Sequence, residues 1–105
     1  MSNSHDAFRD STVTNLSYST SAGTAVSTAG FGTTTFFIKL TAPGAFTSTG
    51  GVRYTVGKGA VASPTASPLL PFNWTQVIKV SPGEQLSAVS NDGVAGTLVV
   101  VELTN

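Results

Sequence analysis

Histidine could serve here as a general base or as a metal ligand, and the chain has only one, His5. A metal site would need His5 together with Asp6 or Asp10, because cysteine is absent from the sequence. A nucleophilic triad would also depend on His5 as its base, and the many serines include no Gly-x-Ser-x-Gly elbow. We therefore expect no metal site, no cofactor and no nucleophilic catalysis.

Carboxylate pairs are equally scarce. Glycoside hydrolysis would have to draw on Glu84, Asp92 and Glu102. Glu84 stands in a turn signal, and Glu102 alternates with apolar neighbours near the end of the chain, so both are expected at solvent-facing positions. Asp92 gives one carboxylate to the turn at 91–93, which is too few oxygen ligands for a calcium loop. The sequence therefore predicts that the protein is not an enzyme.

Composition excludes further classes. The chain has 105 residues, a formal net charge of zero and only 10% charged residues. Its five basic residues are scattered, which predicts neither nucleic-acid binding nor attachment to a membrane surface. The first ten residues lack the basic and apolar regions of a signal peptide, so we expect no export signal. A β-rich composition with much Thr, Ser, Gly and Val but no export signal fits a limited set of protein classes, and virion proteins, which are made in the host cytoplasm, are one of them.

The elements that would position any site are strands. The closing third contains three strand-like runs, and the two turn signals between them predict a three-stranded meander over Gln76–Val80, Gln85–Ser90 and Gly96–Leu103. The first turn contains Pro82 and Gly83, and Gly83 is expected to take the positive φ of a type II turn. The second turn is Asn91-Asp92-Gly93.

The earlier part of the chain alternates short apolar runs with turns. It predicts strands at Thr12–Thr20 (with a bulge near Asn15), Thr24–Thr28 as an edge strand, Thr33–Leu40, and Gly51–Val56. Gly57–Asn73 contains three prolines and is expected to be irregular. We therefore expect an all-β fold, an antiparallel β-sandwich or jelly roll of about seven to eight short strands with essentially no helix. Residues 1–11 are expected to form an N-terminal arm, and 12–105 a single domain.

Several apolar side chains lie in the segment that is expected to be irregular, outside the predicted strands of the sandwich. Leu69, Leu70 and Phe72 cluster in the irregular segment, and Trp74 follows directly. Packing of Trp74 over one end of the core is the favoured interpretation; an anchor in a subunit interface or a platform for sugar rings are the alternatives. The candidate partner-interface residues, including two from the arm, are Phe8, Arg9, Leu69, Leu70, Phe72 and Trp74.

The closing runs Val77–Ser90 and Gly96–Leu103, with the chain length and the Thr/Gly/Ala-rich strands, resemble the small jelly-roll capsid decoration proteins of tailed phages, also called cement or head auxiliary proteins. This resemblance implies a homotrimer on the major capsid protein at the outer surface of the head, where it stabilises the capsid against internal DNA pressure. The near-zero charge implies that attachment is apolar and driven by shape.

Two other functions remain open on the sequence. One is a small carbohydrate-binding or lectin-like module in which Tyr54, Phe72 and Trp74 stack on sugar rings. Retention on a glycan resin would distinguish it from a decoration subunit. The other is a phage fibre or tail accessory protein, which would share the fold and the virion but place the trimer on an axis.

Overall fold

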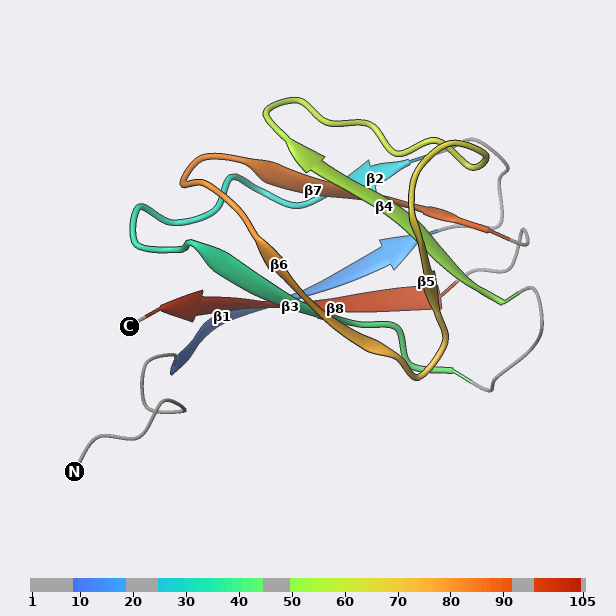
Figure 1. The fold of residues 1–105 in the computed structure, drawn as a ribbon, viewed down its shortest axis with the longest axis horizontal. Helices are drawn as coiled ribbons and strands as arrows, with labels where there is room; N and C mark the ends of the chain where they lie inside the picture. Colours follow the sequence, from blue (N-terminus) through green and yellow to red (C-terminus); the bar gives the residue numbers. More distant parts are fainter. Residues whose placement is uncertain (1–8, 19–24, 45–49, 92–95, 105) are drawn as a thin grey trace.

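Eight β-strands form the framework of the chain in the computed structural model, which describes residues 9–18, 25–44, 50–91 and 96–104 (Figure 1). No helix occurs in these residues, which confirms the all-β prediction. The strands are rich in β-branched residues, which fit a pleated, half-buried surface. They are β1 (Arg9–Tyr18), β2 (Val26–Ser27), β3 (Phe37–Thr41), β4 (Gly51–Gly57), β5 (Leu69–Pro71), β6 (Thr75–Lys79), β7 (Gln85–Ser90) and β8 (Gly96–Thr104).

The strands pair into two four-stranded antiparallel sheets. Sheet A has the order β1-β8-β3-β6, and sheet B has the order β2-β7-β4-β5. The pairs are nested along the chain, because the first strand pairs with the eighth, the second with the seventh, the third with the sixth and the fourth with the fifth. Figure 1 shows the two sheets as separate layers. The predicted antiparallel β-sandwich is therefore confirmed.

The core lies between the sheets and follows the period of two in each strand. On β3, Ile38 and Leu40 are fully buried, as expected for one face of an alternating strand. On β8, Leu98 and Val100 supply the matching positions, and Leu86 faces them from β7 in sheet B. Burial of each such side chain stabilises the fold by about 1.5–3 kcal/mol.

The predicted meander is wrong, although its strand bounds agree with the structure to within one residue. β6 pairs with β3, β7 with β2 and β4, and β8 with β1 and β3, so none of these last three strands pairs with the next. The turn itself forms: Glu84 N donates to Ser81 O (3.1 Å), and Gly83 has a φ of 86°. Gly83 N donates to Phe31 O, and Phe31 N donates to Glu84 O. The turn connects β6 in sheet A to β7 in sheet B. The residues of a turn do not specify whether the next strand pairs with the previous one or joins the other sheet.

Smaller differences concern strand boundaries. The register of β1 shifts between Asp10 and Val13, so the irregularity lies closer to the N-terminus than the bulge predicted near Asn15. β3 begins only at Phe37, after a turn in which Thr35 N donates to Gly32 O (3.1 Å). β2 is an edge strand, as predicted. The segment predicted to be irregular contains β5, a short edge strand. Of the predicted turn at 91–93, only Asn91 lies within the described residues.

Glu102 is expected at a solvent-facing position of its strand, and this prediction is also wrong. It shares the inward parity of Leu98 and Val100 at the end of β8. Its Oε1 accepts hydrogen bonds from Thr35 Oγ1 (2.7 Å) and from Gly32 N (3.0 Å). Thr35 is almost fully buried, so the carboxylate satisfies a hydroxyl that has lost its water.

Candidate interaction surface

The outer face of sheet B is covered by the protein's own chain. The segment between β4 and β5 runs along the top of this sheet in Figure 1. Ala62 N donates to Ser87 Oγ (2.9 Å) on β7, and Arg53 Nη1 donates to Ser67 O (2.8 Å). Val89 shares the outward parity of Ser87 and is nearly inaccessible although it lies outside the core cluster. The proline-containing segment therefore acts as a lid on sheet B.

The outer face of sheet A has no comparable cover among the described residues. One row of directly paired residues crosses all four strands in the order Val13, Val101, Lys39 and Val77. Val13 and Val77 at the two ends of this row are 57% and 53% exposed. Val101 and Leu103 on the central strand β8 are shielded by their neighbours, yet they lie outside the core cluster. This face therefore carries apolar side chains that the monomer does not bury between its sheets.

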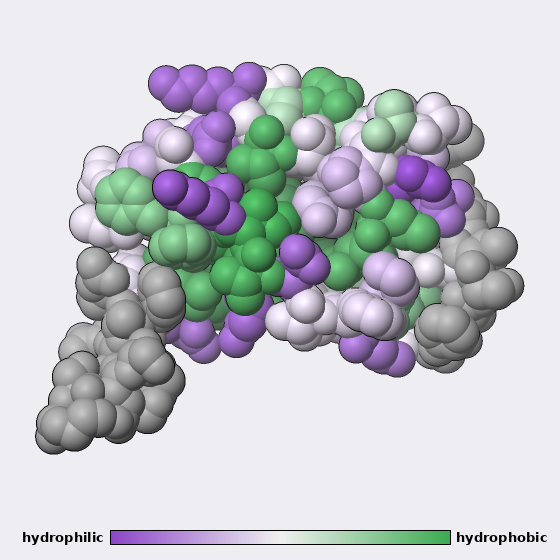
Figure 2. Space-filling view, in the orientation of Figure 1, coloured by the Kyte–Doolittle hydropathy of each residue, from purple (hydrophilic) through white to green (hydrophobic). Residues whose placement is uncertain are grey.

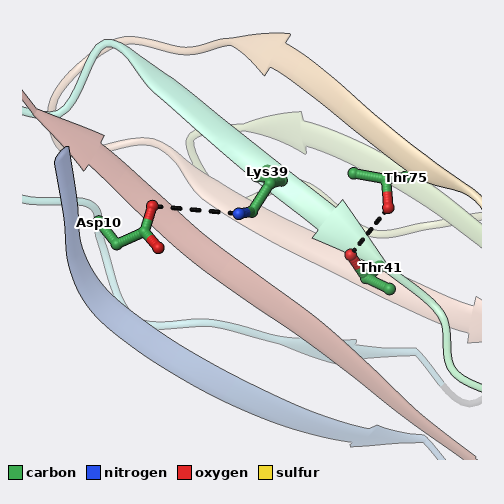
Figure 3. A network of polar contacts seen from close by, with 4 residues as sticks. All are labelled: Asp10, Lys39, Thr41 and Thr75. Atoms are coloured by element: carbon green, nitrogen blue, oxygen red, sulfur yellow. Dashed lines mark hydrogen bonds and ion pairs between the residues drawn. The ribbon is translucent and has the colours of Figure 1, made fainter. Parts of the chain in front are cut away.

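Two polar contacts cross the same face (Figure 3). Lys39 Nζ reaches over β8 to Asp10 Oδ1 at 4.0 Å, and Thr41 and Thr75 bring their hydroxyls to 3.3 Å between β3 and β6. Both partners of the ion pair are substantially exposed, so the pair contributes little to stability. The face thus combines exposed valines at its two edges with a weak, accessible ion pair near its centre.

The two sheets also differ in their edges. Sheet B ends in β2, with two residues, and β5, with three residues including Pro71. Very short strands and proline are common ways of preventing edge-to-edge association. Sheet A ends in β1, with ten residues, and β6, with five, and neither contains proline. Only sheet A therefore presents long strand edges.

The structure disperses the apolar residues singled out from the sequence. Leu70 is buried and belongs to the core, and Phe72 is half-buried against it. Leu69 is 39% exposed and Trp74 is 60% exposed. The favoured interpretation of Trp74 as a core residue is therefore wrong, because the indole extends from the turn in which Trp74 N donates to Pro71 O (3.3 Å).

The arm residues are largely outside the structural description. Phe8 lies outside the described residues, and Arg9 is the first residue of β1, paired with Thr104. Their role at an interface stays a prediction.

Sequence reasoning missed Val13, Phe36 and Val77, which are among the most exposed large apolar residues of the described chain. A signal for this surface was present in the run Leu98-Val-Val-Val101, because a strand with an uninterrupted apolar run is apolar on both faces. In Figure 2, apolar side chains also run across the side of the molecule from the end of β4 to β6 and β3. Half-buried Val56 and Ile78, which pack against the core, belong to these strands.

Two carboxylates of the described residues form hydrogen bonds that hold local structure. Glu84 lies in the predicted turn, where its Oε1 accepts a hydrogen bond from Ser81 N (2.6 Å), and Glu102 Oε1 accepts one from Thr35 Oγ1. Within the described ranges, no three His, Asp or Glu side chains come together in a way that could hold a metal ion. The same residues include no helix long and apolar enough to cross a membrane. His5, Asp6 and Asp92 lie outside the described ranges.

Comparison with known proteins gives a weak likeness. No protein-family model and no curated protein sequence matches the chain. Two solved structures of a pentameric capsid protein isolated from metagenomic phage sequences match with 18% identity and a TM-score of 0.43. The matches cover 86% of this chain and 62% and 61% of those chains, so this chain spans about three-fifths of their length. At this TM-score we base neither fold nor function on the likeness.

Proposed function

We propose that the protein is a non-enzymatic structural protein of a virion, which decorates and stabilises the outer surface of a phage head as a homotrimer bound to the major capsid protein. The observation that carries this proposal is the contrast between the two sheets. Sheet B has a covered outer face and short edges. Sheet A has long edges, and its outer face carries exposed valines at both edges with no cover from the residues that the structure describes. Exposed apolar patches and long open edges are typical of surfaces that bind another protein.

We infer that the sandwich is a jelly roll. The nested pairing of β1 with β8, β2 with β7, β3 with β6 and β4 with β5 supports this assignment. Jelly rolls recur in viral capsid and lectin domains, so the fold is compatible with a virion role but does not by itself select it.

Attachment to the head is assigned to the end of the molecule that carries Trp74 and Leu69. Both side chains are exposed: Leu69 is the first residue of β5, and Trp74 closes the turn that follows β5. Large aromatic side chains that enter a pocket on a partner dominate many interfaces. Because the net charge of the protein is zero, we expect an exposed apolar side chain, and not a charged patch, to anchor it on the head. Phe8 and Arg9 in the arm are proposed to make a separate set of partner contacts, because the strand register places Arg9 at the opposite end of sheet A from Trp74.

Co-sedimentation tests the proposal. Purified protein is mixed with heads assembled from the major capsid protein encoded in the same genome and is then pelleted. The protein is expected to saturate the heads, and Trp74→Ala is expected to weaken binding on the order of 30-fold, which corresponds to a hot-spot residue of ~2 kcal/mol. Val61→Ala is the matched control, because Val61 is 74% exposed on the cover of sheet B. Wild-type protein that stays in the supernatant would refute decoration.

The carbohydrate-binding alternative now depends on Trp74. Of the three aromatic residues assigned to sugar stacking, Trp74 is exposed, whereas Tyr54 and Phe72 pack against the core. A single exposed indole can still stack on a sugar ring. Retention of the wild-type protein on a glycan resin, lost in Trp74→Ala, would favour this function over decoration.

A further inference from the structure

The two edges of sheet A carry complementary groups in matching rows. One row contains, in spatial order, Asp10, Leu103, Phe37 and Lys79; the next contains Val13, Val101, Lys39 and Val77. Each row therefore begins on the β1 edge and ends on the β6 edge. The first row has an acidic residue at one edge and a basic residue at the other, and the second has an exposed valine at both.

The backbone of the β6 edge is oriented to accept another strand. Val80 N donates to Phe36 O (2.8 Å), one position beyond the pair Lys79 and Phe37. Bonded and non-bonded pairs alternate in an antiparallel ladder. Ile78 and Gln76 therefore bond to β3, and the N–H and C=O groups of the alternate residues Thr75, Val77 and Lys79 point away from the sheet.

The same alternation of bonded and non-bonded pairs, followed from β6 across β3 and β8, determines which backbone N–H and C=O groups of β1 point away from the sheet. Thr14, Leu16 and Tyr18 direct their backbone groups to β8, where their partners are Val100, Leu98 and Gly96. The N–H and C=O groups of the intervening residues Val13, Asn15 and Ser17 consequently point outward. Both edges thus offer three alternate residues, and the two strands run in opposite directions across the sheet.

We propose that β1 of one copy pairs antiparallel with β6 of a second copy, with Val13 beside Val77 and Asp10 beside Lys79. This inference rests on the proposed function, because it assigns the contact that builds the homotrimer. Pairing of two different edges is a heterologous interface, which forms a closed ring when the rotation between copies closes. It places the exposed valines of neighbouring copies in contact and sets a carboxylate beside an ammonium group. Pairing of β6 with β6 of a second copy would instead place Lys79 opposite uncharged Thr75.

Cysteine cross-linking tests the geometry, because the natural chain has no cysteine. Val13→Cys and Val77→Cys each add one thiol, and the two variants are mixed, one carrying a mass tag, and treated with a short bismaleimide. The expected main product joins the two different variants. Val61→Cys reports random collisions. A main product joining two Val77→Cys chains, or a yield no higher than with Val61→Cys, would overturn the proposal.

Charge exchange tests the register. Asp10→Lys alone is expected to weaken self-association on the order of fivefold, the value of an exposed ion pair, and Lys79→Glu added to it should restore the association. The intramolecular contact between Asp10 and Lys39 cannot produce that rescue, since Lys79 takes no part in it. Failure of the rescue would refute the placement of Asp10 beside Lys79.

Head binding separates this inference from the proposed function. Monomers that still co-sediment with heads would refute the edge interface and leave decoration standing. Cross-linked rings that do not co-sediment would refute decoration and leave the edge interface standing.

Discussion

Arg53 is expected to hold the cover of sheet B in place. Its Nε donates to Asn91 Oδ1 and its Nη1 to Ser67 O, both at 2.8 Å, so one planar group joins the end of β7 to the covering segment. Hydrogen bonds from a charged donor contribute about 1.5–3 kcal/mol each. Because the side chain is half-exposed, the lower end applies, and Arg53→Ala is expected to cost about 3 kcal/mol in the free energy of unfolding.

Two measurements check this value. For a domain of this size the loss lowers Tm by roughly 10–20 °C. Amide exchange should also accelerate at Ala62, whose N–H donates to Ser87 Oγ beneath the cover. The Tm of Arg53→Lys is expected to lie between those of the wild type and Arg53→Ala, because an ammonium group lacks the forked geometry that reaches both acceptors. Lys58→Ala is the control, since Lys58 is an exposed basic residue directly after β4 and has no part in the contacts of Arg53. If the Arg53→Ala protein matches this control in both measurements, Arg53 does not hold the cover of sheet B in place.

Two further substitutions test the packing of sheet A. Gly96→Ala is expected to destabilise the protein by about 1–3 kcal/mol in urea unfolding, because the added Cβ would lie 2.7 Å from Cζ of buried Tyr18; unchanged stability would show that the ring has room to move. Glu102→Ala is expected to cost about 2 kcal/mol, because the hydroxyl of buried Thr35 loses its acceptor, whereas Glu102→Gln should retain most of the stability. Equal losses in both Glu102 variants would contradict this reasoning.

Local structure could be predicted from the sequence where local chemistry determines it. β6, β7 and β8 were placed to within a residue by their apolar runs, and Gly83 was assigned its positive φ because of Pro82 before it. The pairing of these strands was not predicted. β8 pairs with β1 from the opposite end of the chain, and neither strand carries a residue type that identifies its partner.

The candidate surface was predicted only in part. An aromatic residue after a proline-rich segment is equally suited to a core and to an interface, so the exposure of Trp74 depends on the turn that carries it. Leu70 and Leu69 are adjacent in sequence, and only the pairing of β5 with β4 decides which of them enters the core. The importance of Val77 follows from the sheet order, which puts β6 at an edge.

Light scattering at micromolar concentration gives the mass of the purified protein in solution, and this mass decides whether sheet A joins copies of the chain into a trimer. We expect three times the 10.7 kDa of one chain, and we expect Val77→Glu to reduce this mass to that of a folded monomer. In the monomer the new carboxylate can pair with Lys39, its direct neighbour on β3, so the substitution should not unfold the chain. A wild-type protein that remains a folded monomer at this concentration would contradict the claim that sheet A is an assembly surface.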